Sequence, residues 1–124
     1  MTEGGWHTYW HYGLRVVEGD PAEFAKALRA EGIGCGLGYI GKPIFLCMES
    51  LVAKRTFGTS SYPFDGSHGG RSIDYVQGMC PRTEEILGQM LVLSVHEHMS
   101  RDDITDMAAA VNKVAEALAA RRKG

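Results

Sequence analysis

The chain has 124 residues, 44% of them hydrophobic and 23% charged, which is an ordinary composition for one globular domain. Its formal net charge is -2 and its pI is about 6.2, so no broad basic field is available for nucleic acid or an anionic membrane. Three cysteines without a C-x-x-C pair argue against a disulfide framework. The first residues do not resemble a signal peptide, and no apolar run approaches membrane length, so we expect a cytoplasmic protein.

The segment from Trp6 to Val17 is rich in aromatic and β-branched residues and is predicted to be a strand. Its even-numbered residues share one face, and the opposite face also carries apolar side chains. A strand that is apolar on both sides needs cover on both. We therefore expect an exposed apolar surface and a two-fold homodimer that forms through it, with Trp6, Tyr9 or Trp10 near the contact.

A helix is predicted to follow this strand. Asp20 is a suitable N-cap, Pro21 fits the first helical position, and Gly32 is a suitable stop. A short strand is expected from about Ile33 to Tyr39. Residues 41–79 lack clear periodicity and contain a glycine- and serine-rich stretch, so they are predicted to form a long flexible loop.

The last third of the chain starts with a predicted short helix from Pro81 to Leu87 and a buried strand from Met90 to Val95. Ser100 and Asp103 form a capping box ahead of the final helix. The apolar residues of that helix fall on one stripe at helical spacing: Ile104, Met107, Ala108, Val111, Val114, Ala115 and Leu118. The order β-α-β, long loop, α-β-α indicates an α/β (α+β) two-layer sandwich, with residues 1–124 as one domain and a small sheet covered by helices.

The stretch Gly36-Leu37-Gly38-Tyr39-Ile40-Gly41 has the G-x-G-x-x-G spacing of dinucleotide-binding loops. Such a loop needs a strand before the glycines and a helix that opens on them. Here a helix precedes them, and serines stand where an acidic residue is expected about 20 residues later. The glycines are instead interpreted as ending a helix and letting a strand pass close to another backbone or a ligand.

Three stretches carry a resemblance to a known family: WHTYWHYGLRVVEGDPAEFAKALRAEGI, RAEGIGCGLGYIGKPIF and CPRTEEILGQMLVLSVHEHMSRDDITDMAAAVNKV. In order and spacing they resemble the C-terminal small domain of PLP-dependent sugar aminotransferases of the DegT/StrS type. The resemblance implies that the cofactor lysine and the residues that hold PLP lie in a preceding large domain. We therefore expect a fragment, an excised domain or a split gene product. PLP would be bound by the full-length enzyme and not by this chain alone, which would be inactive.

The resemblance also implies a role in shaping the substrate cleft of an enzyme that aminates a keto sugar or cyclitol. The partners would be the large PLP-binding domain and a small sugar substrate. Tyr39 matches the tyrosine of the family's histidine–tyrosine pair on the substrate side of the cleft, with a simple packing role as the alternative. Gly38 stands where the family often has histidine. Lys42 and Arg55 are further candidates for substrate binding, with exposed loop cations as the alternative. No catalytic, cofactor-binding or metal-binding residue is predicted.

Two alternatives stay open at this point. The chain could be a free-standing α/β binding or regulatory module without catalytic activity, because a fold does not fix a function. His96 and His98 are two positions apart and would share one face of a strand, which makes them a possible metal pair. Because the sequence offers no third ligand nearby, structural histidines are favoured.

Overall fold

The computed structural model describes residues 3–5, 10–66 and 72–124, and within these the chain forms three strands, four α-helices and one 3-10 helix. The fold class is mixed α/β, as predicted. The chain divides into two compact units, one made of Met1–Tyr39 with Gly88–Gly124 and the other of Ile40–Leu87. Within the described part of the chain, no helix has the length and apolar character needed to cross a membrane.

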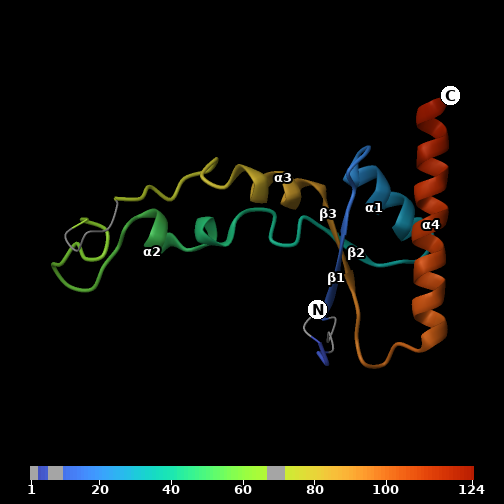
Figure 1. Ribbon diagram of the computed structural model, residues 1–124, viewed down its shortest axis with the longest axis horizontal. Coiled ribbons are helices and arrows are strands. Elements are labelled where there is room, and N and C mark those ends of the chain that lie inside the picture. The colour runs from blue at the N-terminus through green and yellow to red at the C-terminus, as the bar shows by residue number, and fades with distance from the viewer. Residues whose placement is uncertain (1–2, 6–9, 67–71) are drawn as a thin grey trace. The chain divides into compact units, whose positions relative to one another are not determined.

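The first unit is built around a three-stranded antiparallel sheet with the strand order β1-β3-β2 (Figure 1). β1 covers His11–Arg15, β2 covers Cys35–Leu37 and β3 covers Met90–Ser94. β3 is antiparallel to both of its neighbours, so β1 and β2 run parallel to each other on either side of it. The central strand therefore comes from a part of the chain far from the two strands that it joins.

One face of the sheet carries the core. Leu91 and Leu93 of β3 are 0% and 3% exposed, because the alternation of a strand directs both toward α1 (Pro21–Ala30) and α4 (Arg101–Lys123). The ladder places Tyr12 and Leu14 of β1, and Cys35 and Leu37 of β2, opposite these leucines and hence on the same face. The buried cluster consists of Ala25, Leu28, Leu91, Leu93, Ala110 and Val114.

Helix α1 is capped as predicted. Asp20 accepts a hydrogen bond from a first-turn backbone N–H at 2.9 Å. After the last turn, Gly32 has φ 85° and donates to the carbonyl of Arg29, while Ile33 donates to that of Leu28, both at 3.0 Å. These two bonds form a Schellman motif, which requires a left-handed residue and so favours glycine.

Helix α4 starts with the predicted capping box. The backbone N–H of Ser100 donates to Asp103 Oδ2 at 2.7 Å, and the N–H of Asp103 donates to Ser100 Oγ at 3.1 Å. Four residues of the predicted stripe, Met107, Val111, Val114 and Leu118, pack in or against the core, whereas Ile104 is 42% exposed and Ala110, outside the stripe, is buried. Ala110 is small enough to let α4 approach its neighbours closely, so helix packing and not apolar spacing alone fixes the face.

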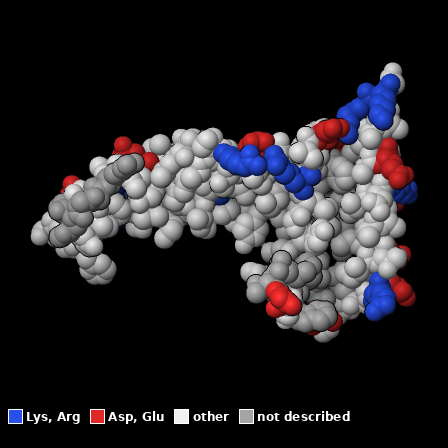
Figure 2. Space-filling view, viewed as in Figure 1, with Lys and Arg blue, Asp and Glu red and all other residues white. Residues whose placement is uncertain are grey.

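Lysine and arginine side chains gather at the C-terminal end of α4 (Figure 2). Arg122 Nη2 lies 4.0 Å from Glu18 Oε2, and Arg121 Nη1 lies 3.9 Å from Glu23 Oε1. Such exposed pairs stabilise a fold only weakly, and the cations also interact favourably with the helix dipole. This basic run is therefore explained by contacts within the first unit.

Several predicted boundaries move by a few residues. β2 ends at Leu37 because Gly38 and Tyr39 have φ values of 67° and 55°, which cannot continue a strand. β1 covers only His11–Arg15, and the predicted contact residues Trp6 and Tyr9 lie outside the described residues. The helix predicted from Pro81 extends to Gln89 as α3, and the buried strand after it ends at Ser94.

The second unit contains the 3-10 helix η1 (Ile44–Cys47), α2 (Glu49–Val52) and most of α3 (Pro81–Gln89). The predicted loop 41–79 thus includes two short helical segments, and its flexibility stays a prediction. Among the described residues of this unit only Pro43 is buried. An aromatic cluster takes the place of a core, with the rings of Phe45 and Phe64 centred 6.0 and 6.2 Å from that of Tyr75.

Replacing Ser100 with alanine is expected to lower the free energy of unfolding by about 1 kcal/mol, because the N-terminal turn of α4 loses a hydroxyl acceptor. Urea denaturation at neutral pH measures the change. Thr105→Ala is the matched control. Its hydroxyl lies in the same helix and donates only to the carbonyl of Arg101, four residues earlier, at 2.9 Å, so its loss should not destabilise the helix. Equal effects of the two variants would contradict the capping role.

The pKa of Asp103 is lowered below 3.8 by hydrogen bonds from the backbone N–H of Ser100 and then from its hydroxyl. A carboxylate with a lowered folded-state pKa stabilises the fold above its unfolded-state pKa, and this stabilisation is lost as pH falls through the folded-state pKa. The stability difference between wild type and Asp103→Asn should therefore be largest near neutral pH and shrink as pH falls below 3.8. Urea titrations of both proteins across this range measure it, and a constant difference would contradict the prediction.

Candidate functional site

Tyr39 lies in a sharp turn directly after β2. The turn consists of two consecutive left-handed residues, Gly38 and Tyr39, and the N–H of Gly38 donates to the carbonyl of Met90 at 2.8 Å. A left-handed φ costs a residue with a side chain roughly 1–2 kcal/mol, and strained residues of this kind cluster at binding sites. Tyr39 is also 55% exposed, so its ring and hydroxyl are accessible to a ligand.

The ring of Tyr39 meets His11 edge-on, with ring centroids 5.9 Å apart and planes at 69°. His11 in turn stacks on Trp10 at 4.8 Å and 20°. Because His11 belongs to β1 and Tyr39 follows β2, the contact joins the two outer strands across β3. It lies on the face opposite α1 and α4, since β1 alternates and His11 points away from the core side. We call Trp10, His11 and Tyr39 the aromatic site.

His11 supplies this site with a buried polar atom. Its Nδ1 is buried, and no hydrogen-bond partner for it exists among the described residues. A buried polar atom without a partner costs about 1–3 kcal/mol, so such an atom often marks a place that water or a ligand completes. The site thus offers aromatic faces for the apolar side of a ring, and a hydroxyl and an imidazole for its polar groups.

Two strands each carry a glycine on the face of the sheet where the aromatic site lies. Gly13 of β1 and Gly36 of β2 both pair with Val92 of β3, so they share the face on which His11 lies. A Cβ built on either glycine would meet nothing within 4 Å among the described residues. Glycine in a strand lets another group approach the backbone closely, and such an approach stays a prediction.

Of the predicted site residues, only Tyr39 belongs to the first unit. Lys42 and Arg55 are in the second unit, and both are exposed. Arg55 Nη2 lies 3.7 Å from Glu49 Oε2, and the two side chains are 69% and 87% exposed. This contact is an ordinary surface ion pair, and a substrate-binding role for Lys42 and Arg55 stays a prediction.

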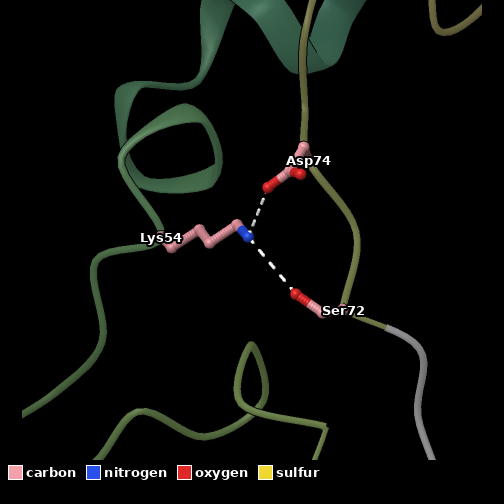
Figure 3. A network of polar contacts seen from close by, with 3 residues as sticks. All are labelled: Lys54, Ser72 and Asp74. Atoms are coloured by element: carbon pink, nitrogen blue, oxygen red, sulfur yellow. Dashed lines mark hydrogen bonds and ion pairs between the residues drawn. The ribbon is translucent and has the colours of Figure 1, made fainter.

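Lys54 has a more defined environment than either of these cations (Figure 3). Its Nζ lies 2.6 Å from Asp74 Oδ1 and 3.5 Å from Ser72 Oγ, and its backbone φ is 48°. The side chain therefore joins the residues after α2 to a segment about twenty positions further on. No sequence pattern predicts this contact, because the pairing depends on how the second unit folds.

A hollow of about 480 Å³ lies beside His96 and His98, whose ring centroids are 6.1 Å apart. Asp103 and Asp106 also line it. Within the described ranges, no group of three or more histidine, cysteine, aspartate and glutamate residues is arranged to hold a metal ion. The hollow is therefore not assigned to a metal.

No family model, curated protein or solved structure matches this chain. Its function is therefore inferred from the aromatic site and from the motifs in the sequence.

His11 is the residue of this site that sequence reasoning missed. The alternation of the first strand places it on the face opposite Tyr12 and Leu14, but that pattern does not identify its neighbour. Tyr39 becomes its neighbour only because β1 and β2 both pair with β3. Contacts of this kind depend on strand order, which short-range sequence patterns do not encode.

Strain at Tyr39 can be separated from its ring contact by two substitutions. Tyr39→Ala and Tyr39→Gly both remove the ring, but only glycine adopts φ 55° without a clash of its Cβ. The glycine variant should therefore be more stable than the alanine variant by about 1 kcal/mol. Thermal or urea unfolding measures the difference. An alanine variant as stable as the glycine variant would show that Tyr39 is not held in the left-handed conformation.

Proposed function

We propose that this chain is the small domain of a PLP-dependent aminotransferase of the DegT/StrS type, and that it shapes the cleft for a keto sugar or cyclitol. The proposed fold is a two-layer sandwich in which α1 and α4 cover one face of the sheet, in the order β-α-β, loop, α-β-α. The observation that carries the proposal is Tyr39. It occupies the position that the resemblance gives to the substrate-side tyrosine, it is exposed, and its backbone is strained.

The aromatic site supplies the groups that a sugar ring requires. Trp10 and Tyr39 offer apolar ring surface, and Trp10 is 75% exposed. The hydroxyl of Tyr39 and the imidazole of His11 can donate to or accept from sugar hydroxyl and carbonyl groups. The family's histidine is missing at Gly38, and in this proposal His11 replaces it from β1, since its ring already meets that of Tyr39.

The residues of this chain do not fit PLP itself. A lysine that forms a Schiff base needs a dry pocket that depresses its pKa, and an acid must face the pyridine nitrogen. Four of the five lysines, Lys26, Lys42, Lys113 and Lys123, are exposed, and the Lys54 ammonium is paired with Asp74, whose side chain is 76% exposed. The proposal therefore assigns the cofactor to a separate large domain, and no chemical step is assigned to this chain.

One observation favours the alternative of a free-standing binding module. The buried cluster and the aromatic site both belong to the first unit, so a ligand could be bound without a second domain. The reading frame upstream of this chain in its genome discriminates between the two functions. A large domain with a cofactor-lysine motif, fused or adjacent, favours the aminotransferase.

The proposed function predicts that the aromatic site binds a nucleotide-linked keto sugar. Titration of the ¹⁵N-labelled chain with this ligand should shift the backbone amides of His11 and Tyr39, and the shifts should disappear in Tyr39→Ala and His11→Ala. Tyr62→Ala is the matched control, because Tyr62 is also 55% exposed but lies in the second unit. If a saturating concentration of the sugar left the backbone amide signals of His11 and Tyr39 unchanged, the proposal would be contradicted.

Reaction of the chain with PLP is an independent test of the proposed function. The chain mixed with PLP and then reduced with borohydride should carry no stoichiometric adduct, as read by intact mass and peptide mapping. A stoichiometric reducible adduct on Lys42 would contradict the assignment of the cofactor to another domain, whatever the outcome with the sugar.

A further inference from the structure

Among the described residues, no strand pairs with the outer side of β1 at His11 and Gly13, and we call this side the free edge. The N–H of Val16 donates to the carbonyl of Gln89 at 2.8 Å, which fixes the alternation of the antiparallel ladder. The backbone groups of Tyr12 and Leu14 consequently face β3, and those of His11 and Gly13 point away from the sheet. No hydrogen bond to these outward groups of His11 and Gly13 is found among the described residues.

The opposite edge of the sheet, on the outer side of β2, is covered by a side chain of α1. The same alternation directs the carbonyl of Cys35 outward from β2, and the guanidinium of Arg29 in α1 donates to it at 2.8 Å. The thiol of Cys35 also donates to the carbonyl of Ala25, at 3.6 Å. Covering an edge with a helix or a cationic side chain is a common protection against strand pairing. Only the β1 edge lacks such a cover within the described part of the chain.

An apolar groove accompanies the free edge. A hollow of about 420 Å³ lies on the helix side, between β1 and α4, with Tyr12, Leu14, Val95, Ile104, Met107 and Val111 in its wall. Tyr12 and Ile104 are 46% and 42% exposed. Free backbone groups next to an apolar groove are the two parts of a site that binds an extended strand: the backbone pairs, and alternate side chains fill the groove.

We propose that the strand bound at this edge is β1 of a second copy of the chain, in an antiparallel two-fold pairing centred on Gly13. The N–H of each Gly13 then donates to the carbonyl of the other. Tyr12 lies opposite Leu14 of the second copy, and the two three-stranded sheets join into one sheet of six strands. This interface does not rest on the proposed sugar site, and it gives a specific form to the homodimer expected from the sequence.

The sequence of β1, HYGLR, is what makes a second copy the fitting occupant. The groove requires a strand with apolar side chains at alternate positions. β1 supplies Tyr12 and Leu14 at these alternate positions and Gly13 between them. A shift of one residue would turn the apolar side chains away from the groove, so the register is specified.

Disulfide trapping with a matched pair of glycines tests the register. Gly13 and Gly36 both pair with Val92 and both have open space at Cβ among the described residues, but only Gly13 lies on the proposed interface. In the dimer the two Gly13 Cα atoms would be about 5.5 Å apart, which is within disulfide range. In a background with Cys47→Ser and Cys80→Ser, Gly13→Cys should form a covalent dimer under mild oxidation and Gly36→Cys should not.

Gly13→Pro tests the backbone pairing. It removes the outward N–H, whereas the ladder to β3 runs through the neighbouring residues, so β1 should still pair with β3. The dimer dissociation constant from sedimentation should rise about tenfold or more, because two hydrogen bonds are lost by symmetry. Circular dichroism shows whether the variant is folded. A strictly monomeric wild type, or equal crosslinking of the two cysteine variants, would overturn the proposal, as would a folded Gly13→Pro variant that dimerises like wild type.

Discussion

The position of β3 between β1 and β2 is the constraint on which the first unit depends. Leu91 and Leu93 direct their side chains into the core and their backbone groups toward β1, while Val92 directs its backbone toward β2. Without this strand the two outer strands would have no hydrogen-bonded neighbour, and α1 and α4 would lose the centre of the surface on which they pack. Residues 90–94 thus hold together segments that lie more than fifty positions away in the sequence.

The register of β3 also decides what each residue of β1 does. Because side chains alternate, Tyr12 and Leu14 contribute to the helix side, and His11 lies on the opposite side, where it meets Tyr39. Because backbone groups alternate as well, Gly13 directs its N–H and carbonyl to the free edge. The core, the aromatic site and the edge are therefore three consequences of one ladder, and a one-residue slip would disturb all of them together.

Features set by short-range chemistry were predictable from the sequence. The Asp20 cap, the Gly32 stop and the Ser100–Asp103 box each involve residues within one or two helical turns. The spacing of α4 also predicted most of its packed face, since Met107, Val111, Val114 and Leu118 pack in or against the core. Features that depend on distant partners were not predictable: the burial of Ala110, the contact of His11 with Tyr39, and the ion pair of Lys54 with Asp74. The second unit gave the weakest signal, since it buries almost no apolar side chain that could impose a period on its sequence.

Gly38 links the turn at Tyr39 to the proposed role of His11. Two consecutive left-handed residues bring the ring of Tyr39 to its place, and each would cost a residue with a side chain roughly 1–2 kcal/mol. Glycine at position 38 removes one of these costs. A histidine at position 38 would therefore disfavour this form of the turn. With glycine there, an imidazole can reach Tyr39 only from another segment, and β1 places His11 beside it. Glycine at position 38 and the contact of Tyr39 with His11 are thus two parts of one arrangement, in which strand pairing places an imidazole beside the turn.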